Sequence, residues 1–237
     1  MNILGLFVVV PVLMILFLFL CKDIKSIRAV MVTGATALLA LTAVLIVTFL
    51  RERAANPDAE MLLVQSWTWY APLNITMTLG VDGISVMMIA LSSIIVFTGV
   101  FSSWNMNMAK EFFLWYCLLT IGVFGFFITI DLFSMFMFYE VALIPMYLLI
   151  GLWGTGKKEY SAMKLTLMLM GGSAFLMIGI IGIFFTSGAT TFNIVDIANS
   201  VRIPIEHQRW IFPVTFLGFG VLGALFPFHT WSPDGHA

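Results

Sequence analysis

The chain has 237 residues, of which 61% are hydrophobic and 10% are charged, with a formal net charge of −1. A soluble domain carries roughly 45–50% apolar and about 25% charged residues, so this chain has too few polar side chains to cover a soluble globule. The composition, with a mean hydropathy of +1.07, excludes a soluble enzyme and a nucleic-acid-binding domain. Cys21 and Cys117 lie in apolar runs and predict neither a disulfide framework nor a metal site.

Several apolar runs are long enough to cross a bilayer, which takes about 20 helical residues. They predict an all-α membrane protein with about seven transmembrane helices, over 3–20, 29–50, 83–104, 112–130, 132–153, 162–187 and 210–226. These helices leave no room for a sizeable soluble domain. The segment 61–80 contains Trp67, Trp69 and Tyr70, and such residues favour the headgroup level. We therefore expect this segment to lie at one membrane interface.

Basic residues are unevenly distributed among the short loops. One set of alternate loops contains Lys22, Lys25, Arg28, Lys110, Lys157 and Lys158. The opposite set contains Arg51, Arg53, Arg202 and Arg209. The first set is richer in basic residues and less balanced by acids. The positive-inside rule therefore predicts that it faces the cytoplasm and that the N-terminus lies outside.

One acidic residue, Glu140, lies deep inside a predicted membrane helix. It stands eight residues after Leu132 and thirteen before Trp153, which is roughly 12 Å from one face and about 20 Å from the other. A carboxylate at this depth costs several kcal/mol unless it is paired, hydrated or protonated. Glu140 is therefore either a proton or ion site or a neutral structural acid bonded to a neighbouring helix.

Two further residues bear on Glu140. Pro145 has no N–H to donate to the carbonyl of Val141, so the helix there either admits water or a side chain or carries a simple packing kink. Lys164 lies about 6 Å from the face that is roughly 20 Å from Glu140, so we expect no direct ion pair between them. Lys164 either snorkels to the interface or hands protons to a water path.

The seventh predicted helix is interrupted by Pro227 and Pro233. Proline lacks the N–H that a helix needs, so we expect a broken helix with unpaired carbonyls, a feature that lines cavities or binding sites in membranes. His229 lies between the prolines and either relays protons or is an interfacial histidine at a helix end. Small residues on the sixth helix predict close helix contacts, namely Gly171, Gly172, Gly179 and Gly182.

Three motifs, in the same order and spacing, resemble a known family. They are Leu79–Ser85, Phe138–Gly154 (with its Pro145-Met146-Tyr147) and Phe226–Asp234. Over essentially its whole length the chain is similar to the antiporter-like proton-pumping membrane subunits of respiratory complex I, NADH:quinone oxidoreductase. The proline-methionine-tyrosine version of the second motif favours chain M, which is chain 4 in mitochondria.

The resemblance implies a fold and a set of site residues. It implies the first half of an antiporter-like inverted-repeat fold, with helices 1–3 in residues 1–104 and the first repeat, apparently truncated, in 105–237. It also implies a proton path through Glu140, Lys164 and His229, in which Glu140 is the acid of an ion pair.

The sequence departs from the family pattern in two ways. The positions of the expected lysine and proline, seven and five residues before His229, hold Leu222 and Ala224. Family members also continue well past this length, so we expect the chain to be a fragment.

The resemblance further implies a subunit of an oxidoreductase complex in the bacterial inner membrane, or alternatively the mitochondrial inner membrane, next to L-like and N-like subunits. The chain has no glycine-rich dinucleotide loop and no cysteine cluster. NADH, FMN, iron–sulfur clusters and quinone are therefore expected in partner subunits, with no cofactor, metal or nucleic acid bound by this chain. Two alternatives stay open: a subunit of a multisubunit cation/proton antiporter, or a non-pumping structural subunit, which Leu222 favours.

Overall fold

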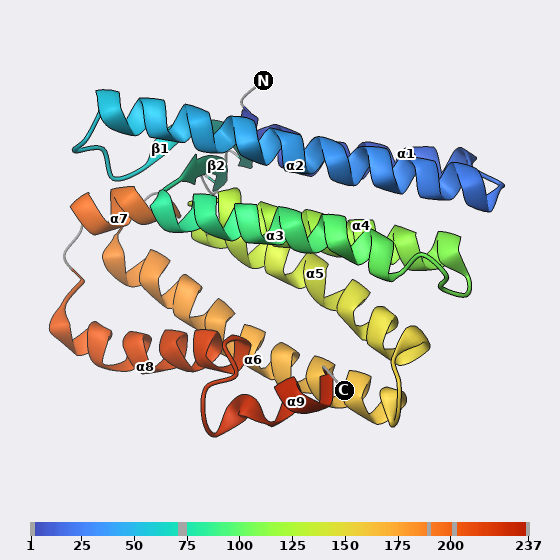
Figure 1. Cartoon of the computed structure of the whole chain (residues 1–237). Coiled ribbons are helices and arrows are strands. Elements are labelled where there is room, and N and C mark those ends of the chain that lie inside the picture. Colours follow the sequence, from blue (N-terminus) through green and yellow to red (C-terminus); the bar gives the residue numbers. More distant parts are fainter. Residues whose placement is uncertain (1–2, 71–74, 189–190, 201–202, 236–237) are drawn as a thin grey trace. The chain divides into compact units, whose positions relative to one another are not determined.

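A computed structural model describes residues 3–70, 75–188, 191–200 and 203–235, and Figure 1 shows the course of the chain. Arg202, which contributes to the predicted charge asymmetry, lies outside the described residues. The chain divides into two compact units. The first consists of Met1–Ser66 and Thr78–Ile130, and the second of Trp67–Met77 and Asp131–Ala237. The grouping into 1–104 and 105–237 stays a prediction.

The first unit is a bundle of four long helices. They are α1 (Ile3–Leu20), α2 (Ile24–Ala55), α3 (Gly83–Ser102) and α4 (Ala109–Ile128). α1 packs against α2 and α4, and α2 packs against α3. The bundle core is apolar, with the rings of Phe7 and Phe124 5.3 Å apart between centroids. A polar contact, 2.6 Å between the buried hydroxyls of Thr42 and Ser93, ties α2 to α3.

Two basic side chains close one end of this unit. Lys110 donates to the backbone carbonyls of Phe19 and Cys21, 3.2 and 3.0 Å away. Arg28 donates to the carbonyl of Trp104 at 2.7 Å. These bonds hold the α1–α2 and α3–α4 connections together, so the basic residues of both loops lie at the same end of the bundle.

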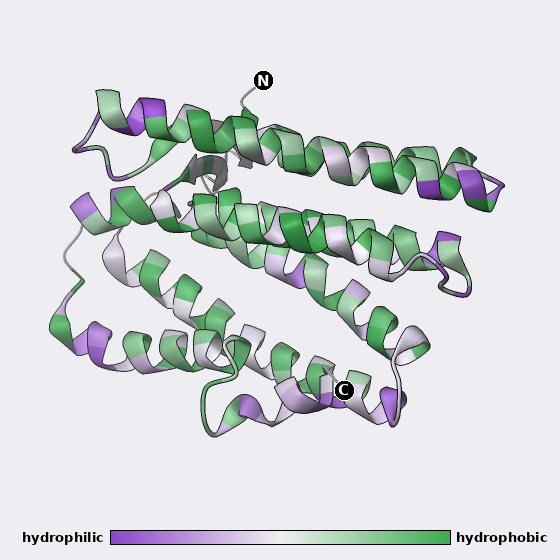
Figure 2. Ribbon diagram, viewed as in Figure 1, coloured by the Kyte–Doolittle hydropathy of each residue, from purple (hydrophilic) through white to green (hydrophobic). Residues whose placement is uncertain are grey.

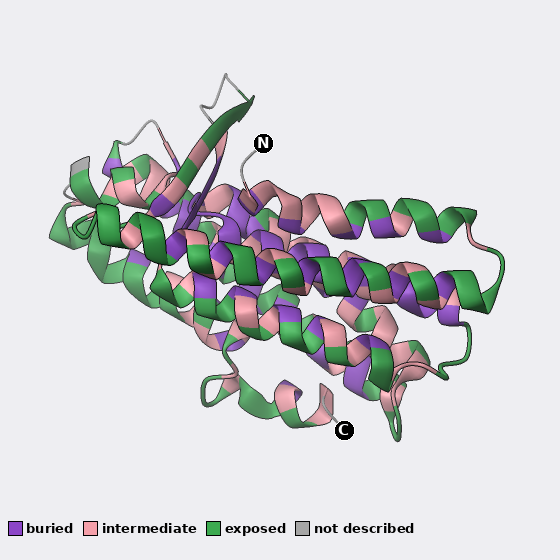
Figure 3. Ribbon diagram, turned by 45° about the horizontal axis from the view of Figure 1, so that its top comes forward, coloured by how far each residue is buried: buried purple, intermediate pink, exposed green. Residues whose placement is uncertain are grey.

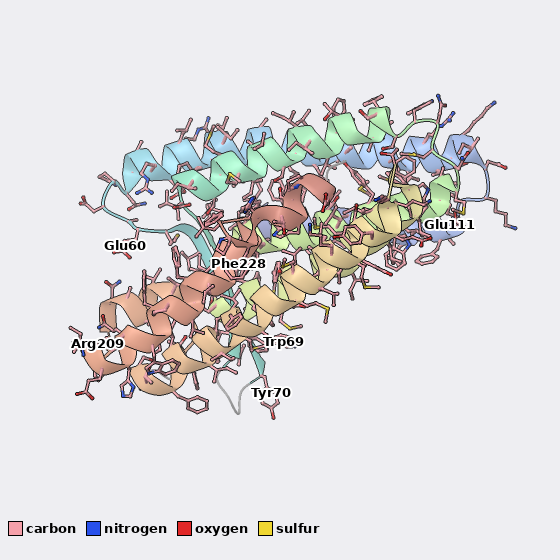
Figure 4. The ribbon with its side chains drawn as sticks, turned by 90° about the horizontal axis from the view of Figure 1, so that it is seen from below. Glu60, Trp69, Tyr70, Glu111, Arg209 and Phe228 are labelled. Carbon is pink, nitrogen blue, oxygen red and sulfur yellow. The ribbon has the colours of Figure 1, made fainter. Side chains whose placement is uncertain are left out.

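The predicted interfacial segment 61–80 forms a β-hairpin. Strands β1 (Leu62–Tyr70) and β2 (Ile75–Val81) pair in a two-stranded sheet. Alternating β-branched and aromatic residues favour this structure. Trp69 and Tyr70, labelled in Figure 4 at the end of β1, are 61% and 51% exposed. The hairpin pairs its own backbone groups, which suits a segment at a membrane surface.

The second unit is built around one long helix. Its elements are α5 (Leu132–Trp153), α6 (Lys158–Ser187), α7 (Ile194–Ser200), α8 (Ile205–Leu222), a 3₁₀ turn (Phe228–Thr230) and α9 (Trp231–Gly235). α6 packs against α5, α8 and α9. Its core contains Phe136 of α5, Leu176 and Ile180 of α6, and Phe192.

The chain is a multi-pass membrane protein. Within the described residues six helices, α1 to α6, are long and apolar enough to cross a bilayer. Figure 2 shows apolar residues along these helices and hydrophilic ones mostly near their ends, and Figure 3 shows buried stripes beside exposed faces. The predicted seventh span differs: α8 begins at Ile205, carries Glu206 and Arg209 in its first turns, and ends at Leu222. Its apolar part is therefore shorter than a full crossing.

The predicted break after the seventh helix is confirmed. α8 ends at Leu222, Ala224 has a left-handed φ of 52°, and the Phe226–Pro227 peptide is cis. The expectation of unpaired carbonyls is only partly met. The carbonyl of Gly220 accepts from Leu225 N at 2.7 Å, and that of Val221 accepts from Ala224 N at 3.2 Å and from the indole N–H of Trp231 at 2.9 Å. The break is thus a capped turn.

Candidate functional site

The site is built on α5, whose bounds agree with the predicted helix. Asp131 caps its first turn, because the Oδ1 atom accepts from Ser134 N at 2.8 Å. The helix continues through Pro145, which is buried within it. Since proline has no N–H, the carbonyl of Val141 lacks its usual donor one residue after Glu140. The local sequence therefore places an acid and a weakened helical turn side by side.

Glu140 faces a cavity of about 420 Å³ between α5 and α6. Its Oε1 atom is buried and has no hydrogen-bond partner among the described residues. Tyr147 from α5 and Thr166 from α6 also line this cavity, and the rest of the lining is apolar: Met137, Val141, Leu143, Ile144 and Met170. A half-buried acid with a buried, unmet oxygen and room beside it is suited to hold a proton or a water molecule.

Tyr139, the neighbour of Glu140, fixes how α5 sits on α6. It is buried, and its hydroxyl donates to the carbonyl of Leu169 at 3.2 Å. Successive helical residues point about 100° apart, so this bond helps to set the direction of the Glu140 side chain.

Lys164 pairs with an acid that the sequence analysis left without a role. Its Nζ atom lies 2.6 Å from Oδ2 of Asp234, which joins α6 to α9. The partner of Lys164 is thus Asp234 rather than Glu140, in agreement with the depth argument. The lysine and the aspartate side chains are 23% and 40% exposed. The sequence shows Asp234 directly after Pro233 of the interrupted helix, but no local pattern there indicates which cation it meets.

His229 and Leu222 lie apart from these pairs. His229 is in the exposed 3₁₀ turn, with its ring 5.6 Å from that of Phe226 between centroids. Leu222 is the half-buried last residue of α8. Among the contacts of the described residues, none joins His229 to Glu140 or to Lys164. The proton-path assignment of Glu140, Lys164 and His229 remains a prediction.

A second set of polar atoms at the start of α5 was missed by sequence reasoning. Asp131 and Ser134 are 0% and 3% exposed, and Asp131 Oδ2 and Ser134 Oγ have no partner in the described part of the chain. Burial raises the pKa of Asp131 above its ordinary value, and the hydrogen bond from Ser134 N only partly offsets this. Their position before an apolar run is typical of a helix cap, which concealed them.

Ser134 lines a cavity of about 410 Å³ between α5 and the strands β1 and β2. The α5 wall is formed by Ser134, Met137, Phe138 and Val141, and the hairpin wall by Trp67, Thr68, Trp69 and Met77. The rings of Trp69 and Phe133 lie 6.1 Å apart between centroids. This cavity shares Met137 and Val141 with the one that contains Glu140.

Neither cavity holds a set of metal ligands. Among the described residues no group of three His, Cys, Asp or Glu side chains could hold a metal ion, and Cys21 and Cys117 are both free. The carboxyl, amine and imidazole side chains of Glu140, Lys164 and His229 are of types that can bind and release protons.

Comparison with known proteins shows what the chain is similar to, in sequence and in fold. Residues 129–237 match the family described as NADH:quinone oxidoreductase/Mrp antiporter, transmembrane. The NAD(P)H-quinone oxidoreductase chain 4 3 of Picosynechococcus is 34% identical over 184 residues, which are 76% of this chain and 33% of the relative. Chain 4-2 of Synechocystis is 30% identical over 175 residues, 73% of this chain and 31% of the relative. The chain thus spans about a third of the length of these curated relatives.

Solved structures share the fold. A chain of respiratory complex I from Thermus thermophilus with bound NADH superposes with a TM-score of 0.85 at 24% identity, over 98% of this chain and 46% of that one. A chain of the Mrp complex from Dietzia gives a TM-score of 0.79 at 21% identity, over 98% of this chain and 43% of that one. Both likenesses concern the fold alone.

Proposed function

Because residues 129–237 belong to the NADH:quinone oxidoreductase/Mrp antiporter transmembrane family, we propose that this chain is a proton-translocating membrane subunit of NADH:quinone oxidoreductase. The relatives named as chain 4 support this assignment over the antiporter alternative. In this proposal the protein lies in the bacterial inner membrane, between L-like and N-like subunits. Partner subunits hold NADH, FMN, iron–sulfur clusters and quinone, and perform the redox chemistry.

The observation that carries the proposal is the state of Glu140. Its Oε1 atom is buried without a partner beside a cavity of about 420 Å³. An unpaired carboxyl group inside a membrane is costly and is retained where it binds a proton or an ion. Leu222 offers no charge to pair with it, so in this proposal Glu140 is the acid that binds the proton.

Lys164 with Asp234 forms a second proton-binding group in this proposal. The pair lies near the end of α6 that carries Lys157 and Lys158, because Lys164 is only six residues after the first residue of the helix, roughly 9 Å. Glu140 lies deeper in the unit. A proton could thus be held at two different depths, with His229 in the exposed break as a third site.

The test is Glu140→Gln in the intact complex, with NADH-driven proton uptake measured in sealed vesicles beside the rate of quinone reduction. Glutamine keeps the size of the side chain and cannot release a proton. We expect proton uptake per NADH attributable to this subunit to fall by roughly tenfold or more, as for loss of an acid–base group.

The matched control is Glu159→Gln, which changes an exposed acid in the first turn of α6. It should leave uptake per NADH unchanged. Unaltered pumping and quinone reduction in Glu140→Gln would reject Glu140 as a proton site. That outcome would favour a structural subunit that holds its neighbours without pumping, as Leu222 in place of a lysine also favours.

A further inference from the structure

A groove runs between α1 and α2, which pack against each other in the first unit. Its volume is about 240 Å³. Each helix lines it with four residues at helical spacing, namely Val10, Leu13, Met14 and Phe17 from α1 and Val30, Thr33, Gly34 and Ala37 from α2. Residues spaced by three and four positions share one face of a helix, so the groove follows the course of both helices.

Small residues of α2 open this groove. Gly34 is buried, and a Cβ atom added there would collide with the side chain of Met14, so the two helices touch along the floor of the groove. Thr33 and Ala37 lie on either side of Gly34 in the lining and are exposed. The hydroxyl of Thr33 donates to the carbonyl of Ala29 at 2.8 Å within its own helix. The lining is therefore an apolar surface that suits a hydrocarbon chain.

The groove occupies one half of the membrane, near the loop that joins α1 to α2. Phe17 and Val10 lie roughly 5 and 15 Å from the last residue of α1, and Val30 and Ala37 lie roughly 9 and 20 Å from the first residue of α2. The exposed residues of α1 all lie within 12–20, in the half next to this loop, as Figure 3 shows. One leaflet of hydrocarbon is about 15 Å thick. The groove thus matches the length of a lipid tail and is too short for a transmembrane helix.

Cations lie at the loop end of the groove. The loop and the first turns of α2 contain Lys22, Lys25 and Arg28 beside one acid, Asp23. Arg28 is held by Trp104, with a hydrogen bond of 2.7 Å to its carbonyl and the guanidinium carbon 4.7 Å from the centroid of its ring. Lys22 and Lys25 are exposed, and the side chain of Asp23 does not cap α2. The two lysines are therefore suited to meet an anion at the membrane surface.

We propose that this groove binds an anionic phospholipid of the leaflet next to the α1–α2 loop, with an acyl chain between the two helices and the headgroup phosphate at Lys22 and Lys25. The tail gains little from burial, because a lipid tail is as apolar as the lining, so the groove positions the lipid and the lysines select its charge. We expect this end to face the cytoplasm, where the leaflet is negatively charged. The inference goes beyond the proposed function and does not depend on proton translocation.

The test is photolabelling of the protein in its native assembly, reconstituted in phosphatidylcholine vesicles that contain a small share of a probe lipid. Two probes carry the same diazirine-bearing acyl chain and differ in headgroup, which is anionic phosphatidylglycerol in one and uncharged overall, as phosphatidylcholine, in the other. Illumination couples the chain to the residues beside it. Mass spectrometry of proteolytic fragments then gives the labelling yield at residues 10–17 and 30–37.

We expect the phosphatidylglycerol probe to label these two segments on the order of tenfold more than the phosphatidylcholine probe, because each lysine near a membrane surface favours an anionic headgroup by about fivefold. Equal yields from the two probes would overturn the proposal, and this comparison needs no variant. An absence of labelling by either probe would also overturn it, since a neighbouring chain would then cover the groove.

The headgroup site is tested by Lys22→Gln combined with Lys25→Gln. This double variant should lose the preference for phosphatidylglycerol and keep the labelling by phosphatidylcholine, because it removes the charges and leaves the groove intact. The matched control is Lys157→Gln combined with Lys158→Gln, in the loop before α6 on the same predicted side of the membrane. An equal loss of preference in both double variants would show a general effect of surface charge and would reject the site.

The tail site is tested by Ala37→Phe, whose ring fills the groove. It should lower the labelling by both probes several-fold. Ala43→Phe makes the same change at an exposed residue of α2 that does not line the groove, and it should leave both yields unchanged. Labelling at 10–17 and 30–37 that survives Ala37→Phe would show that the tail lies elsewhere and would overturn the proposal.

Discussion

Glu140 and Lys164 show how differently two charges are accommodated in one unit. Lys164 has a carboxylate 2.6 Å away, supplied by Asp234 at a distance of 70 residues in sequence. Glu140 has only a cavity and a buried, unbonded oxygen. Depth along a helix indicated that these two side chains would not meet. The pairing of Lys164 could not be predicted, because it depends on how the chain folds back after the break.

The aspartate caps of α3 and α5 are chemically alike and differ in environment. Asp82 Oδ1 accepts from Ser85 N at 2.7 Å, as Asp131 Oδ1 does from Ser134 N at 2.8 Å. Burial acts to raise the pKa of Asp82, but the hydrogen bonds from Ser85 outweigh it and hold the pKa below its ordinary value of 3.8. For Asp131 burial dominates and the pKa is raised. The sequence shows both caps but not this difference.

The cap of α3 leads to a prediction about stability and pH. Asp82→Ala should lower the free energy of unfolding by about 1 kcal/mol at neutral pH, because it removes the acceptor for Ser85 N. A carboxyl group with a lowered folded pKa stabilises the protein above its ordinary value of 3.8, and this contribution is lost as the pH falls through the folded pKa. The difference in the free energy of unfolding between the native protein and Asp82→Ala should therefore narrow as the pH falls below the ordinary pKa of 3.8.

Thermal unfolding in detergent, recorded over a pH series, measures this difference. Asp82→Asn is the matched control, since its amide oxygen still accepts from the backbone and asparagine is a good cap. A deficit in Asp82→Ala that stays constant across the acid range would contradict the assignment of the stabilisation to the ionised carboxylate.

At the scale of elements, apolar runs predicted helices well and predicted their ends less well. The bounds of α1 and α5 agree with the sequence-based ranges, whereas α2 continues to Ala55, beyond the predicted end at Leu50. Its last turns contain Arg51, Glu52 and Arg53, which are good helix formers but are charged. A hydropathy pattern indicates the part of a helix that lies in lipid. The helix itself extends beyond this part, because its charged ends are also helical. The sequence did not predict the hairpin, because aromatic residues favour both the membrane interface and β-strands.

The glycines of α6 were predicted to mark close contacts, and three of the four do. A Cβ atom added at Gly172 would lie 2.8 Å from Cβ of Val221, and one at Gly182 would lie 2.8 Å from the Trp210 ring. A Cβ atom at Gly179 would collide with Thr215. Gly171 is the exception, because nothing lies within 4 Å of the corresponding position. The sequence shows glycine at these positions, and only the packing of α8 shows which of them need it.

These neighbours allow a paired prediction. Gly172→Ala should destabilise the protein by about 1–3 kcal/mol, because the new methyl group meets the branched carbon of Val221 and α8 must shift. Gly171→Ala should stabilise it by up to about 1 kcal/mol, because alanine favours the helix and meets no atom.

The melting temperatures of Gly172→Ala, Gly171→Ala and the native protein, measured in detergent, test the two predictions together. Both substitutions add one methyl group, and the two positions are neighbours in α6. A lower melting temperature for one variant and a higher one for the other would therefore be due to the contact between α6 and α8. Equal effects of both substitutions would show that α8 does not pack against α6 as closely as described.

At the scale of the whole molecule, the distribution of charge predicts orientation. The loops at 21–23 and 103–108 are held at one end of the first unit by Lys110 and Arg28. That end is rich in basic residues, so we expect it to face the cytoplasm, with the loop at 56–61 outside.

Cysteine labelling in intact cells measures the orientation. A membrane-impermeant maleimide should label Asp58→Cys and should leave Met106→Cys unlabelled until the membrane is opened, both positions being exposed in the structure. The opposite pattern of labelling would reverse the predicted topology.

The sequence by itself determined that this chain lies in a membrane, where most of its helices run, that Glu140 is deep and that the last helix is broken. These properties follow from local composition and from distance along a helix, which are the same wherever the helix packs. The tertiary structure alone decided that Lys164 pairs with Asp234, that Gly172 and not Gly171 is a contact, and that the oxygens of Ser134 and Glu140 face adjoining cavities. These are properties of side chains that meet across elements, and no local pattern contains them.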